Sequence, residues 1–321
     1  MNMAEAIQFS LGPIGSNLRG KLLAEESMAR HVSWRAGGIA KRVYKPADSD
    51  DLAVFLRTLP ADEPLCFVGL GSNLLVRDGG YRGTVILMHD THAALSIDGA
   101  CVRAQAGVAS PKVARFAATQ GLEGAEFLAG VPGTIGGALA MNAGCHGAET
   151  WQFVERVCTI NRHGVLRDRS PSDYDIGYRH CALHVAGEDW FVAAWLRFHP
   201  GSAAQARARI RELLASRIAS QPLNLPNAGS VFRNPPGDHA ARLIEACGLK
   251  GFAIGAARIS EKHANFIVNP GGKACAGDIE ALIAHALRTV RDRHGITLVP
   301  EVRIVGDAVG DAVGDAVGDS Q

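Results

Sequence analysis

The feature that most restricts the fold of this chain is a glycine-rich stretch without charged side chains, GVPGTIGGALAMNAG, at residues 130–144. Its fifteen residues include five glycines and one proline. The glycine spacing does not fit the G-x-G-x-x-G pattern of dinucleotide-binding βαβ units, and no Lys-Ser or Lys-Thr pair follows it as in a P-loop. If this loop binds phosphate, it does so in another fold.

Length and composition describe an ordinary globular chain. Its 321 residues suffice for two or three domains, and 47% hydrophobic with 20% charged residues is typical of such domains. A formal net charge of +1 produces no broad field that would attract nucleic acid or an anionic membrane. We interpret the one basic cluster, Arg207, Arg209, Arg211 and Arg217, as the solvated face of a helix. No nucleic-acid partner is expected.

The seven cysteines are scattered and odd in number, and they form no C-x-x-C pair. This pattern indicates neither a disulfide framework nor a metal site. The first sixteen residues lack a basic segment followed by a long apolar core, so they do not predict a secretory signal. The uncharged run at 127–145 is interrupted by Pro132 and several glycines, which argues against membrane insertion. We therefore expect a cytoplasmic protein.

Local signals divide the first 200 residues into an α/β part and a sheet-rich part. Asp48 or Ser49 can cap a helix that Pro60 ends, and apolar strands with a glycine turn follow it. A second helix is delimited by Ser110 as its cap, Pro111 at its first position and Gly121 just past its end. Strand-like segments with turns between them fill 150–202, which predicts antiparallel sheet.

After residue 202 the pattern changes again. It predicts a long helix, a short helix closed by Gly248, a helix capped by Asp278 and a final strand at 296–305. These elements predict a second α/β domain at about 203–305. The four-residue repeats at 306–321 combine glycine and aspartate, which disfavour helix and strand, and predict a disordered tail.

Two glycine loops stand at predicted strand ends, GLGSNLLV from Gly69 and the stretch at 130–144, and WRAGG at 34–38 adds a third. A bound pyrophosphate needs several backbone N–H groups that converge without Cβ atoms in the way, and a helix that begins near Thr134 would add its dipole. The alternative is that these glycines only form tight turns.

Several motifs in one order carry a resemblance to a known family. They are SWRAGG, VGLGSNLLVRDGGYRGTVI, GLEGAEFLAGVPGTIGGALAMNAG, GYR, NAGSVFRNP, GLKGFAIGAARISEKHANFIVN and LVPEVRIVG. Over about residues 20–306 the chain resembles UDP-N-acetylenolpyruvoylglucosamine reductase, a bacterial flavoprotein of peptidoglycan synthesis that makes UDP-N-acetylmuramate.

The resemblance implies an α+β fold. An FAD-binding domain of the vanillyl-alcohol oxidase (PCMH) type at 20–202 would consist of two subdomains, at about 20–88 and 89–202. A C-terminal α/β substrate-binding domain at 203–305 and the tail at 306–321 would follow. The glycine loops would then bind the FAD pyrophosphate.

The resemblance also implies the reaction. NADPH reduces a non-covalently bound FAD and leaves, and hydride from flavin N5 then adds to the enol ether of UDP-N-acetylglucosamine enolpyruvate. The negative charge that develops beside the substrate carboxylate calls for a fixed cation, a hydrogen-bond donor and an acid that protonates carbon. By resemblance, Arg179 is the cation, Glu301 is the partly protonated donor and Ser230 is the proton source.

Further residues are assigned by the same resemblance. The cofactor-binding residues would be Arg35, Gly69, Gly71, Ser72, Asn73, Leu74, Pro132, Gly133, Thr134, Ile135, Gly136, Gly137, Asn142 and Gly144. The substrate-binding residues would be Tyr178, Arg233, Asn234, Lys262 and His263. No metal is implied, and a monomer is expected.

Local context alone would favour other roles for these residues. Arg179 could form a surface ion pair, Ser230 could stabilise a turn, and Glu301 could occupy the solvent side of a strand. His263 could order its own loop. Only the family motifs favour catalysis over these alternatives.

Two departures from the family pattern stand out. Cys145 and His146 occupy positions where the family commonly has Ala and Tyr, and the stretch between Tyr178 and Trp195 is too short for the tyrosine-bearing substrate loop of one branch. The chain therefore resembles the branch without that loop. Two other hypotheses stay open, another FAD-dependent oxidase or dehydrogenase of the same fold and a nucleotide-binding module without turnover.

Overall fold

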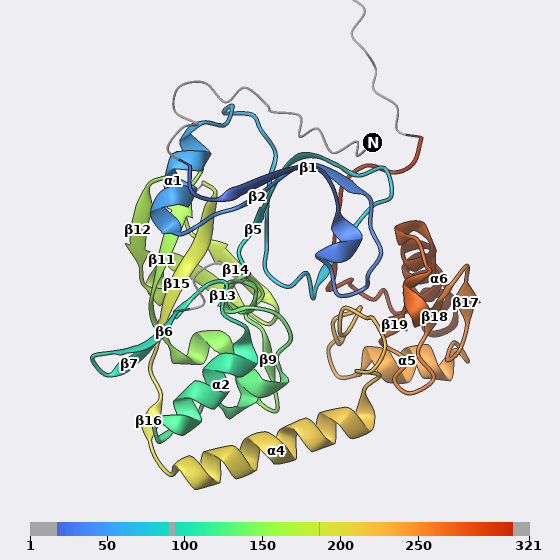
Figure 1. Ribbon diagram of the computed structural model, residues 1–321. Coiled ribbons are helices and arrows are strands. Elements are labelled where there is room, and N and C mark those ends of the chain that lie inside the picture. The colour runs from blue at the N-terminus through green and yellow to red at the C-terminus, as the bar shows by residue number, and fades with distance from the viewer. Residues whose placement is uncertain (1–17, 90–93, 186, 311–321) are drawn as a thin grey trace, which may run out of the picture.

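The computed structural model describes residues 18–89, 94–185 and 187–310, and it mixes helices and sheets throughout (Figure 1). The first sixteen residues, which do not predict a secretory signal, lie outside the described residues, and so does most of the repeat tail, from residue 311. Within the described ranges, none of the helices combines the length and apolar character that crossing a membrane requires. Three groups of elements follow one another along the chain.

The first group is a four-stranded sheet in the order β1-β2-β5-β3. Its strands are β1 (Lys21–Ser27), β2 (Ile39–Lys45), β3 (Leu65–Val68) and β5 (Tyr81–Leu87), with η2 (Met28–Arg30) and β4 (Leu74–Val76) between them. The predicted helix is confirmed as α1 (Ser49–Arg57), and its cap is Asp48, whose side chain accepts from the Asp51 N–H at 2.8 Å. The buried side of α1 packs Leu52 and Phe55 against Ile160 and Val192, which joins this group to the next.

The second group is an antiparallel five-stranded sheet in the order β12-β11-β15-β7-β6. The sequence predicts antiparallel sheet for the region of β11, β12 and β15, and β6 and β7 join it from 95–105. Its strands are β6 (Leu95–Asp98), β7 (Cys101–Gln105), β11 (Val154–Asn161), β12 (Leu166–Arg169) and β15 (Asp189–Leu196). Around it lie α2 (Ser110–Thr119), β8 (Leu122–Glu123), η3 (Glu126–Gly130), α3 (Ile135–Ala140), β9 (Gly144–Cys145), β10 (Ala148–Glu149), η4 (Thr150–Phe153), η5 (Pro171–Asp173), β13 (Tyr174–Gly177), β14 (His180–Leu183) and β16 (His199–Pro200). The expected cap of α2 is wrong, because Ser110 is already the first helical residue and Ala109 is the cap.

The third group contains the C-terminal elements. They are α4 (Ala203–Ser220), α5 (Ala240–Ala246), β17 (Ala253–Ile254), β18 (Ala257–Ile259), β19 (Ile267–Val268), η6 (Pro270–Gly272), α6 (Ala276–His294) and β20 (Arg303–Val305). Helix α4 runs along the lower edge of Figure 1 from the second group to the third. Its buried residues Ala206 and Ile210 belong to the core of the second group.

The core of the third group includes Trp34, Ala36 and Leu75 from the first group. Trp34 and Leu75 are both fully buried in this cluster, and the Trp34 indole N–H donates to the Ile267 carbonyl at 2.8 Å. The Asn269 amide in turn donates to the Trp34 carbonyl at 2.9 Å. These contacts tie the third group to the N-terminal sheet, and the domain boundaries at 88, 202 and 305 stay a prediction.

Two local expectations about the C-terminal elements are wrong. Asp278 is not the cap of α6: the cap is Cys275, and Asp278 lies at the third helical position, where its side chain accepts from the Cys275 N–H at 3.3 Å. The final strand extends only over Arg303–Val305, because its partner is the three-residue strand β4. That parallel pairing returns the chain to the first group.

Candidate active site

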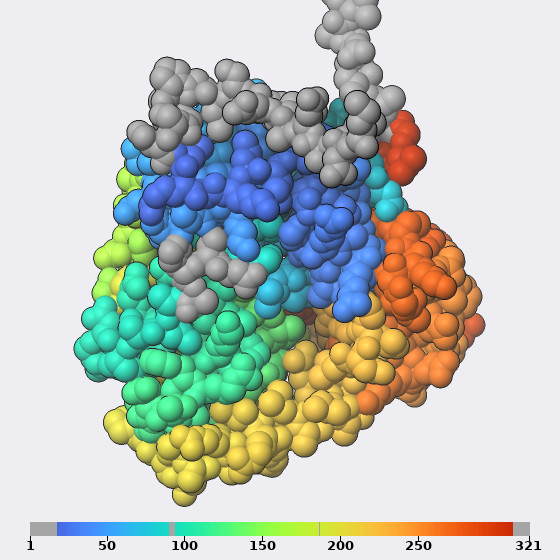
Figure 2. All heavy atoms as spheres, viewed as in Figure 1, coloured from blue at the N-terminus to red at the C-terminus, as the bar shows by residue number. Residues whose placement is uncertain are grey.

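A large cleft lies where the three groups meet, with a volume of about 1060 Å³. Its walls come from β3, from the two glycine loops, from the C-terminal end of α4 and from the chain around β20. In Figure 2, the N-terminal part in blue, the middle part in green and the C-terminal part in orange converge above α4 in yellow. Small-molecule sites usually occupy about 300–1,000 Å³, so this cleft is large enough for an extended ligand.

The two glycine loops pack directly against each other. A Cβ atom on Gly69 would lie 2.2 Å from the Thr134 Oγ1 atom, and a Cβ on Gly133 would lie 2.5 Å from the Ser72 Oγ atom. Gly133 also has a φ of +95°, which residues with a side chain rarely adopt. The glycines at these two positions are therefore required by the contact between the loops.

Gly137 differs from those glycines. It lines the cleft, its φ is not positive, and a Cβ there would have only the Thr134 Oγ1 atom nearby, at 3.9 Å. Packing within the described residues therefore gives no reason for glycine at this position. A flat or extended ligand that lies against the backbone would give one.

Arg179 lies at the tip of the hairpin of β13 and β14, with Tyr178 as the other turn residue. Its φ of +53° is unusual for a residue with a side chain, and such strain is concentrated at functional sites. The Arg179 Nε atom donates to the Glu301 Oε1 atom at 2.9 Å, and its Nη2 atom donates to the Gly144 carbonyl at 3.0 Å. The two charged side chains are only 17% and 16% exposed.

Glu301 is held by its backbone as well as by this ion pair. Its N–H donates to the Val231 carbonyl at 2.7 Å, and its carbonyl accepts from the Asn73 amide at 3.1 Å. Burial raises the pKa of the Glu301 carboxyl above its usual value, and the positive charges of Arg179 and Arg233 oppose that rise. A proton therefore stays on Glu301 to a higher pH than on an exposed glutamate.

Ser230 lines the same cleft, on the segment that pairs with Glu301. Gly229 precedes it with a φ of +75°, and the Gly229 N–H donates to the Asn227 side chain at 2.9 Å. After it, the Asn265 side chain accepts from the Phe232 N–H at 3.0 Å and donates to the Phe232 carbonyl at 2.8 Å. The serine is therefore presented by a segment fixed on both sides.

The cleft brings together most of the residues predicted from the sequence. Its lining includes Gly69, Gly71, Ser72, Asn73, Leu74, Pro132, Thr134, Gly136, Gly137, Gly144, Arg179, Ser230 and Glu301. Outside the lining are Arg35, Gly133, Ile135, Asn142, Tyr178, Arg233, Asn234, Lys262 and His263. The roles assigned to all of these residues stay predictions.

Several residues outside the lining have partners within the protein. The Lys262 Nζ atom donates to the Ile218 carbonyl at 2.5 Å, and the Asn234 side chain accepts from the Ala240 N–H at 3.1 Å, at the start of α5. The His263 Nδ1 atom accepts from the Asn265 N–H at 3.3 Å. Arg233 is different, because its Nε atom is buried and has no hydrogen-bond partner in the described part of the chain.

Arg217 corrects the interpretation of the basic cluster. Arg207, Arg209 and Arg211 are exposed, as expected, whereas Arg217 is half-buried and lines the cleft. Burial lowers the pKa of its guanidinium, and its Nε atom donates to the neutral Gln221 side chain at 2.8 Å. A usable signal was present in the sequence, because Arg217 continues the buried stripe of Ala206, Ile210 and Leu213 at helical spacing.

Cys145 and His146, the two residues that depart from the family pattern, lie at the hairpin of β9 and β10. His146 and Gly147 join β9 to β10 and have φ values of +55° and +84°, the pattern of a two-residue hairpin turn. The Cys145 thiol donates to the Phe127 carbonyl at 3.0 Å, and burial raises its pKa. A Cβ on Gly130 would lie 2.8 Å from that sulfur, so the turn packs closely on the glycine loop.

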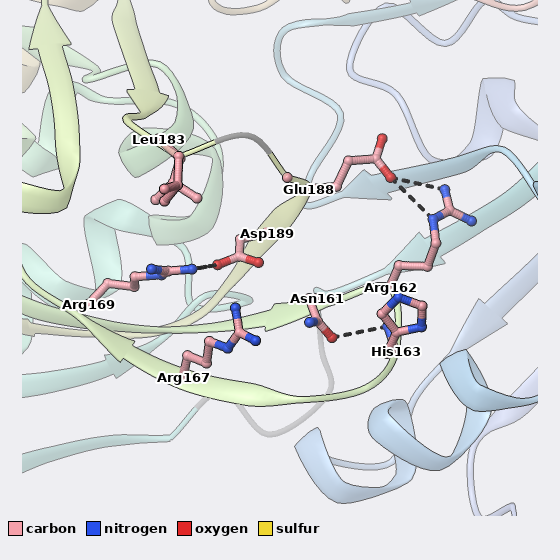
Figure 3. Close-up of a pocket in the computed structure, with 10 residues that line it drawn as sticks. Asn161, Arg162, His163, Arg167, Arg169, Leu183, Glu188 and Asp189 are labelled. Carbon is pink, nitrogen blue, oxygen red and sulfur yellow. Dashed lines mark hydrogen bonds and ion pairs between the residues drawn. The ribbon is translucent and has the colours of Figure 1, made fainter. Parts of the chain in front are cut away.

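A second depression, of about 480 Å³, lies beside the five-stranded sheet (Figure 3). Its arginines are largely neutralised by carboxylates: Arg162 contacts Glu188 at 3.0 Å, and Arg169 contacts Asp189 at 2.7 Å. Figure 3 shows Arg162 directed toward Glu188 and Arg169 directed toward Asp189. This arrangement offers little net charge for an anionic ligand.

Comparisons with known proteins match two parts of the chain that contribute to the cleft. Residues 40–168 match the family described as FAD binding domain, and residues 221–305 match the C-terminal domain of UDP-N-acetylenolpyruvoylglucosamine reductase. The chain is 59% identical to the UDP-N-acetylenolpyruvoylglucosamine reductase of Thiobacillus denitrificans, with 90% of this chain and 94% of the relative covered. It is 60% identical to that of Alkalilimnicola ehrlichii, with 90% and 96% covered.

A solved structure is similar over nearly the whole chain. The crystal structure of UDP-N-acetylenolpyruvylglucosamine reductase from Thermus caldophilus superposes with a TM-score of 0.75 at 30% identity, covering 89% of this chain and 99% of that one. With the FAD binding domain match, this similarity confirms the predicted α+β fold class.

Proposed function

The chain belongs to the UDP-N-acetylenolpyruvoylglucosamine reductase family, and from this premise we propose that it reduces the enolpyruvyl ether of UDP-N-acetylglucosamine enolpyruvate with hydride that NADPH supplies. The product would be the lactyl ether, UDP-N-acetylmuramate. The observation that carries this function is the Arg179–Glu301 pair, which lies with Ser230 in the cleft between the glycine loops and the C-terminal elements.

The residues of the cleft fit FAD. Gly137 leaves its backbone open to the cleft where packing requires no glycine, and Gly69 and Thr134 line the same wall. We propose that these two loops hold the cofactor without a covalent bond. When bound there, FAD supplies the hydride that is transferred to the substrate. The protein's part is to bind and orient the reactants and to manage charge and protons.

Arg179 and Glu301 would bind the substrate carboxylate. The planar guanidinium of Arg179 suits a carboxylate, and its charge stabilises the enediolate that forms when hydride adds to the terminal carbon. Glu301 lies against this guanidinium, and its raised pKa favours the protonated form that can donate a hydrogen bond to the same group. Two ionised carboxylates at this place would repel each other.

Ser230 would protonate the carbon beside the carboxylate. A hydroxyl is a weak acid, so this step depends on the strong basicity of the enediolate and on close placement of the serine. The fixed segment between Gly229 and Phe232 supplies that placement.

An anaerobic titration in two steps tests the function. The purified protein should be yellow, NADPH should bleach it, and UDP-N-acetylglucosamine enolpyruvate should restore the colour with one equivalent. Acid precipitation should release the flavin into solution, because the attachment is non-covalent. Failure of the sugar nucleotide to reoxidise the flavin, with rapid reoxidation by oxygen, would favour another flavoenzyme.

Replacement of Ser230 by alanine separates the two half-reactions. We expect Ser230→Ala to leave bleaching by NADPH within about twofold of the wild type and to slow reoxidation by the sugar nucleotide by at least about a hundredfold. Stopped-flow absorbance at the flavin band measures both steps. Equal loss in the two steps would show that Ser230 is not the carbon acid.

We further propose that the enzyme acts as a cytoplasmic monomer. The three proposed catalytic side chains come from one chain, and all seven cysteines are free thiols, as a reducing compartment favours. Size-exclusion chromatography coupled to light scattering tests whether the protein is a monomer. Fractionation of cells that produce the protein tests whether it is cytoplasmic.

A further inference from the structure

We propose that Asn142, supported by Glu149, is a positioning residue that fixes the Arg179 guanidinium in the cleft. This inference rests on the proposed function, in which Arg179 binds the substrate carboxylate. It also assigns Asn142 a different task from the cofactor contact expected from the sequence.

The side chain of Asn142 is fully engaged within the protein. Its Nδ2 atom donates to the Glu149 Oε2 atom at 2.9 Å and to the Gly177 carbonyl at 3.0 Å. Its Oδ1 atom accepts from the Trp151 N–H at 3.2 Å. Asn142 is only 2% exposed, and both of its amide protons are used. The side chain therefore has no donor left for a cofactor.

The backbone just before Arg179 and its guanidinium group both contact the segment from Asn142 to Gly144. Gly177, whose carbonyl Asn142 holds, is the last residue of β13 and lies two positions before Arg179. At the other end of the side chain, the guanidinium donates to the Asn142 carbonyl at 3.5 Å and to the Gly144 carbonyl at 3.0 Å. The hairpin tip and the charged group are thus fixed by one short piece of backbone.

Glu149 closes this arrangement from the opposite strand. It pairs with Gly144 across the β9–β10 hairpin, so its carboxylate and the Gly144 carbonyl belong to the same local unit. The Glu149 backbone N–H also donates to the Gln152 side chain at 3.0 Å. Glu149 therefore orients the Asn142 amide toward Gly177.

Arg179 needs such support for two reasons. Its φ of +53° is costly for an arginine, so surrounding contacts must hold the turn in place. Its guanidinium donates to Glu301 and also to the Asn142 and Gly144 carbonyls, so its position depends on this segment as well as on the ion pair. Displacing a charged group by about 1 Å can cost up to about a hundredfold in rate, so this placement matters for the reaction.

The test replaces Asn142 by glycine in the FAD-loaded enzyme. Glycine tolerates the φ of +40° at this position, so Asn142→Gly removes the three side-chain hydrogen bonds without adding backbone strain. Glu25→Gly is the matched control, because Glu25 is exposed, has a φ of +49° and lies in β1 away from the cleft. We expect Asn142→Gly to slow flavin reoxidation by the sugar nucleotide by about ten- to a hundredfold, with bleaching by NADPH within about threefold.

A second readout does not depend on turnover. Binding of UDP-N-acetylmuramate, which carries the same carboxylate, should weaken by about tenfold or more in Asn142→Gly and stay unchanged in Glu25→Gly, as measured by calorimetry. Flavin content and melting temperature are recorded for each variant. If Asn142→Gly does not retain flavin, Glu149→Ala replaces it, because that change leaves the backbone at 142 intact, and Glu149→Gln, which keeps an acceptor oxygen, should be milder.

A double-mutant comparison decides between positioning and general structure. If Asn142 acts through Arg179, Asn142→Gly should have almost no further effect on reoxidation in an Arg179→Lys background. Multiplicative effects, or equal loss of both half-reactions in Asn142→Gly, would overturn the inference. If Arg179→Lys alone left reoxidation unchanged, the proposed function of Arg179 would fail instead.

Discussion

At the scale of single residues, the cleft contains charged groups whose behaviour depends on burial. Burial raises the pKa of the Glu301 carboxyl, and the positive charges of Arg179 and Arg233 limit that rise. Arg217 is a half-buried cation whose side-chain hydrogen-bond partner, among the described residues, is the neutral Gln221. A buried charge without an opposite charge is costly, so an anionic ligand would relieve this cost.

Arg217 should therefore contribute to binding of an anionic group. We expect Arg217→Gln to raise the KM for UDP-N-acetylglucosamine enolpyruvate by about tenfold with kcat nearly unchanged, because a charge-assisted contact made equally in ground and transition states is lost. Steady-state kinetics at low ionic strength measures this change. Arg207→Gln, on the exposed face of the same helix, serves as control, and equal KM values in the two variants would contradict the assignment.

His263 gives a prediction about pH. Burial lowers the pKa of its imidazole below the ordinary 6.5, and its Nδ1 atom must be unprotonated to accept from the Asn265 N–H. The folded state therefore favours neutral His263, and this stability is present above about pH 6.5 and is lost as the pH falls through the lowered folded-state pKa.

Replacing the imidazole by a non-titrating acceptor should remove that dependence. We expect the urea midpoint of the wild type to fall more between about pH 8 and pH 5 than that of His263→Asn, whose side-chain oxygen can accept the same hydrogen bond. Equilibrium unfolding followed by tryptophan fluorescence measures both proteins. Parallel profiles would show that His263 does not contribute to the pH dependence.

At the scale of elements, a turn of the N-terminal sheet holds the longest C-terminal helix. The Asp78 carboxylate accepts from the Ala276 N–H at 2.9 Å and from the Gly277 N–H at 2.8 Å, at the start of α6. The neighbouring Arg77 pairs with Glu280 on the same helix at 2.7 Å. The first turn of α6 is therefore satisfied by a residue about 200 positions away in the sequence.

Removing the Asp78 carboxylate should destabilise the whole chain. We expect Asp78→Ala to lower the free energy of unfolding by about 1–2 kcal/mol, because two backbone donors and a favourable interaction with the helix dipole are lost. Denaturant titration measures the change. Asp62→Ala, an exposed loop substitution, is the control; if it costs as much, the contact with α6 contributes nothing.

At the scale of the whole molecule, the C-terminal elements are not an independent unit. Their core contains Trp34 and Leu75 from the first group, and β20 pairs with β4 in parallel. Across the cleft, the Arg179–Glu301 pair joins them to the hairpin of the second group. The cleft thus lies between parts that depend on one another for their cores.

A separate C-terminal fragment should therefore not fold. We expect residues 221–305 alone to show no cooperative unfolding transition, because the buried indole of Trp34 and its hydrogen bond to Ile267 are missing. Circular dichroism in a urea series measures this. Cooperative unfolding of the fragment, with native-like helix content, would show that the contacts with Trp34 are dispensable.

Local signals in the sequence predicted what local physics controls. The capped helix α1, the proline-started helix α2 and the antiparallel middle sheet were all predicted correctly, because caps, turns and apolar periodicity act over a few residues. The order of the glycine-rich motifs indicated the family, which the comparisons confirm. The sequence alone therefore determined the fold class and the chemistry to look for.

Only the tertiary structure decided how the site is built. Arg179 and Glu301 are 122 positions apart, Asp78 reaches α6 across 198 positions, and the short strand β20 has the length of its partner β4. Arg217 faces the cleft and Asn142 is committed to the protein because of what surrounds them. Burial and hydrogen bonding depend on partners brought together by the whole chain, and no window of the sequence contains them.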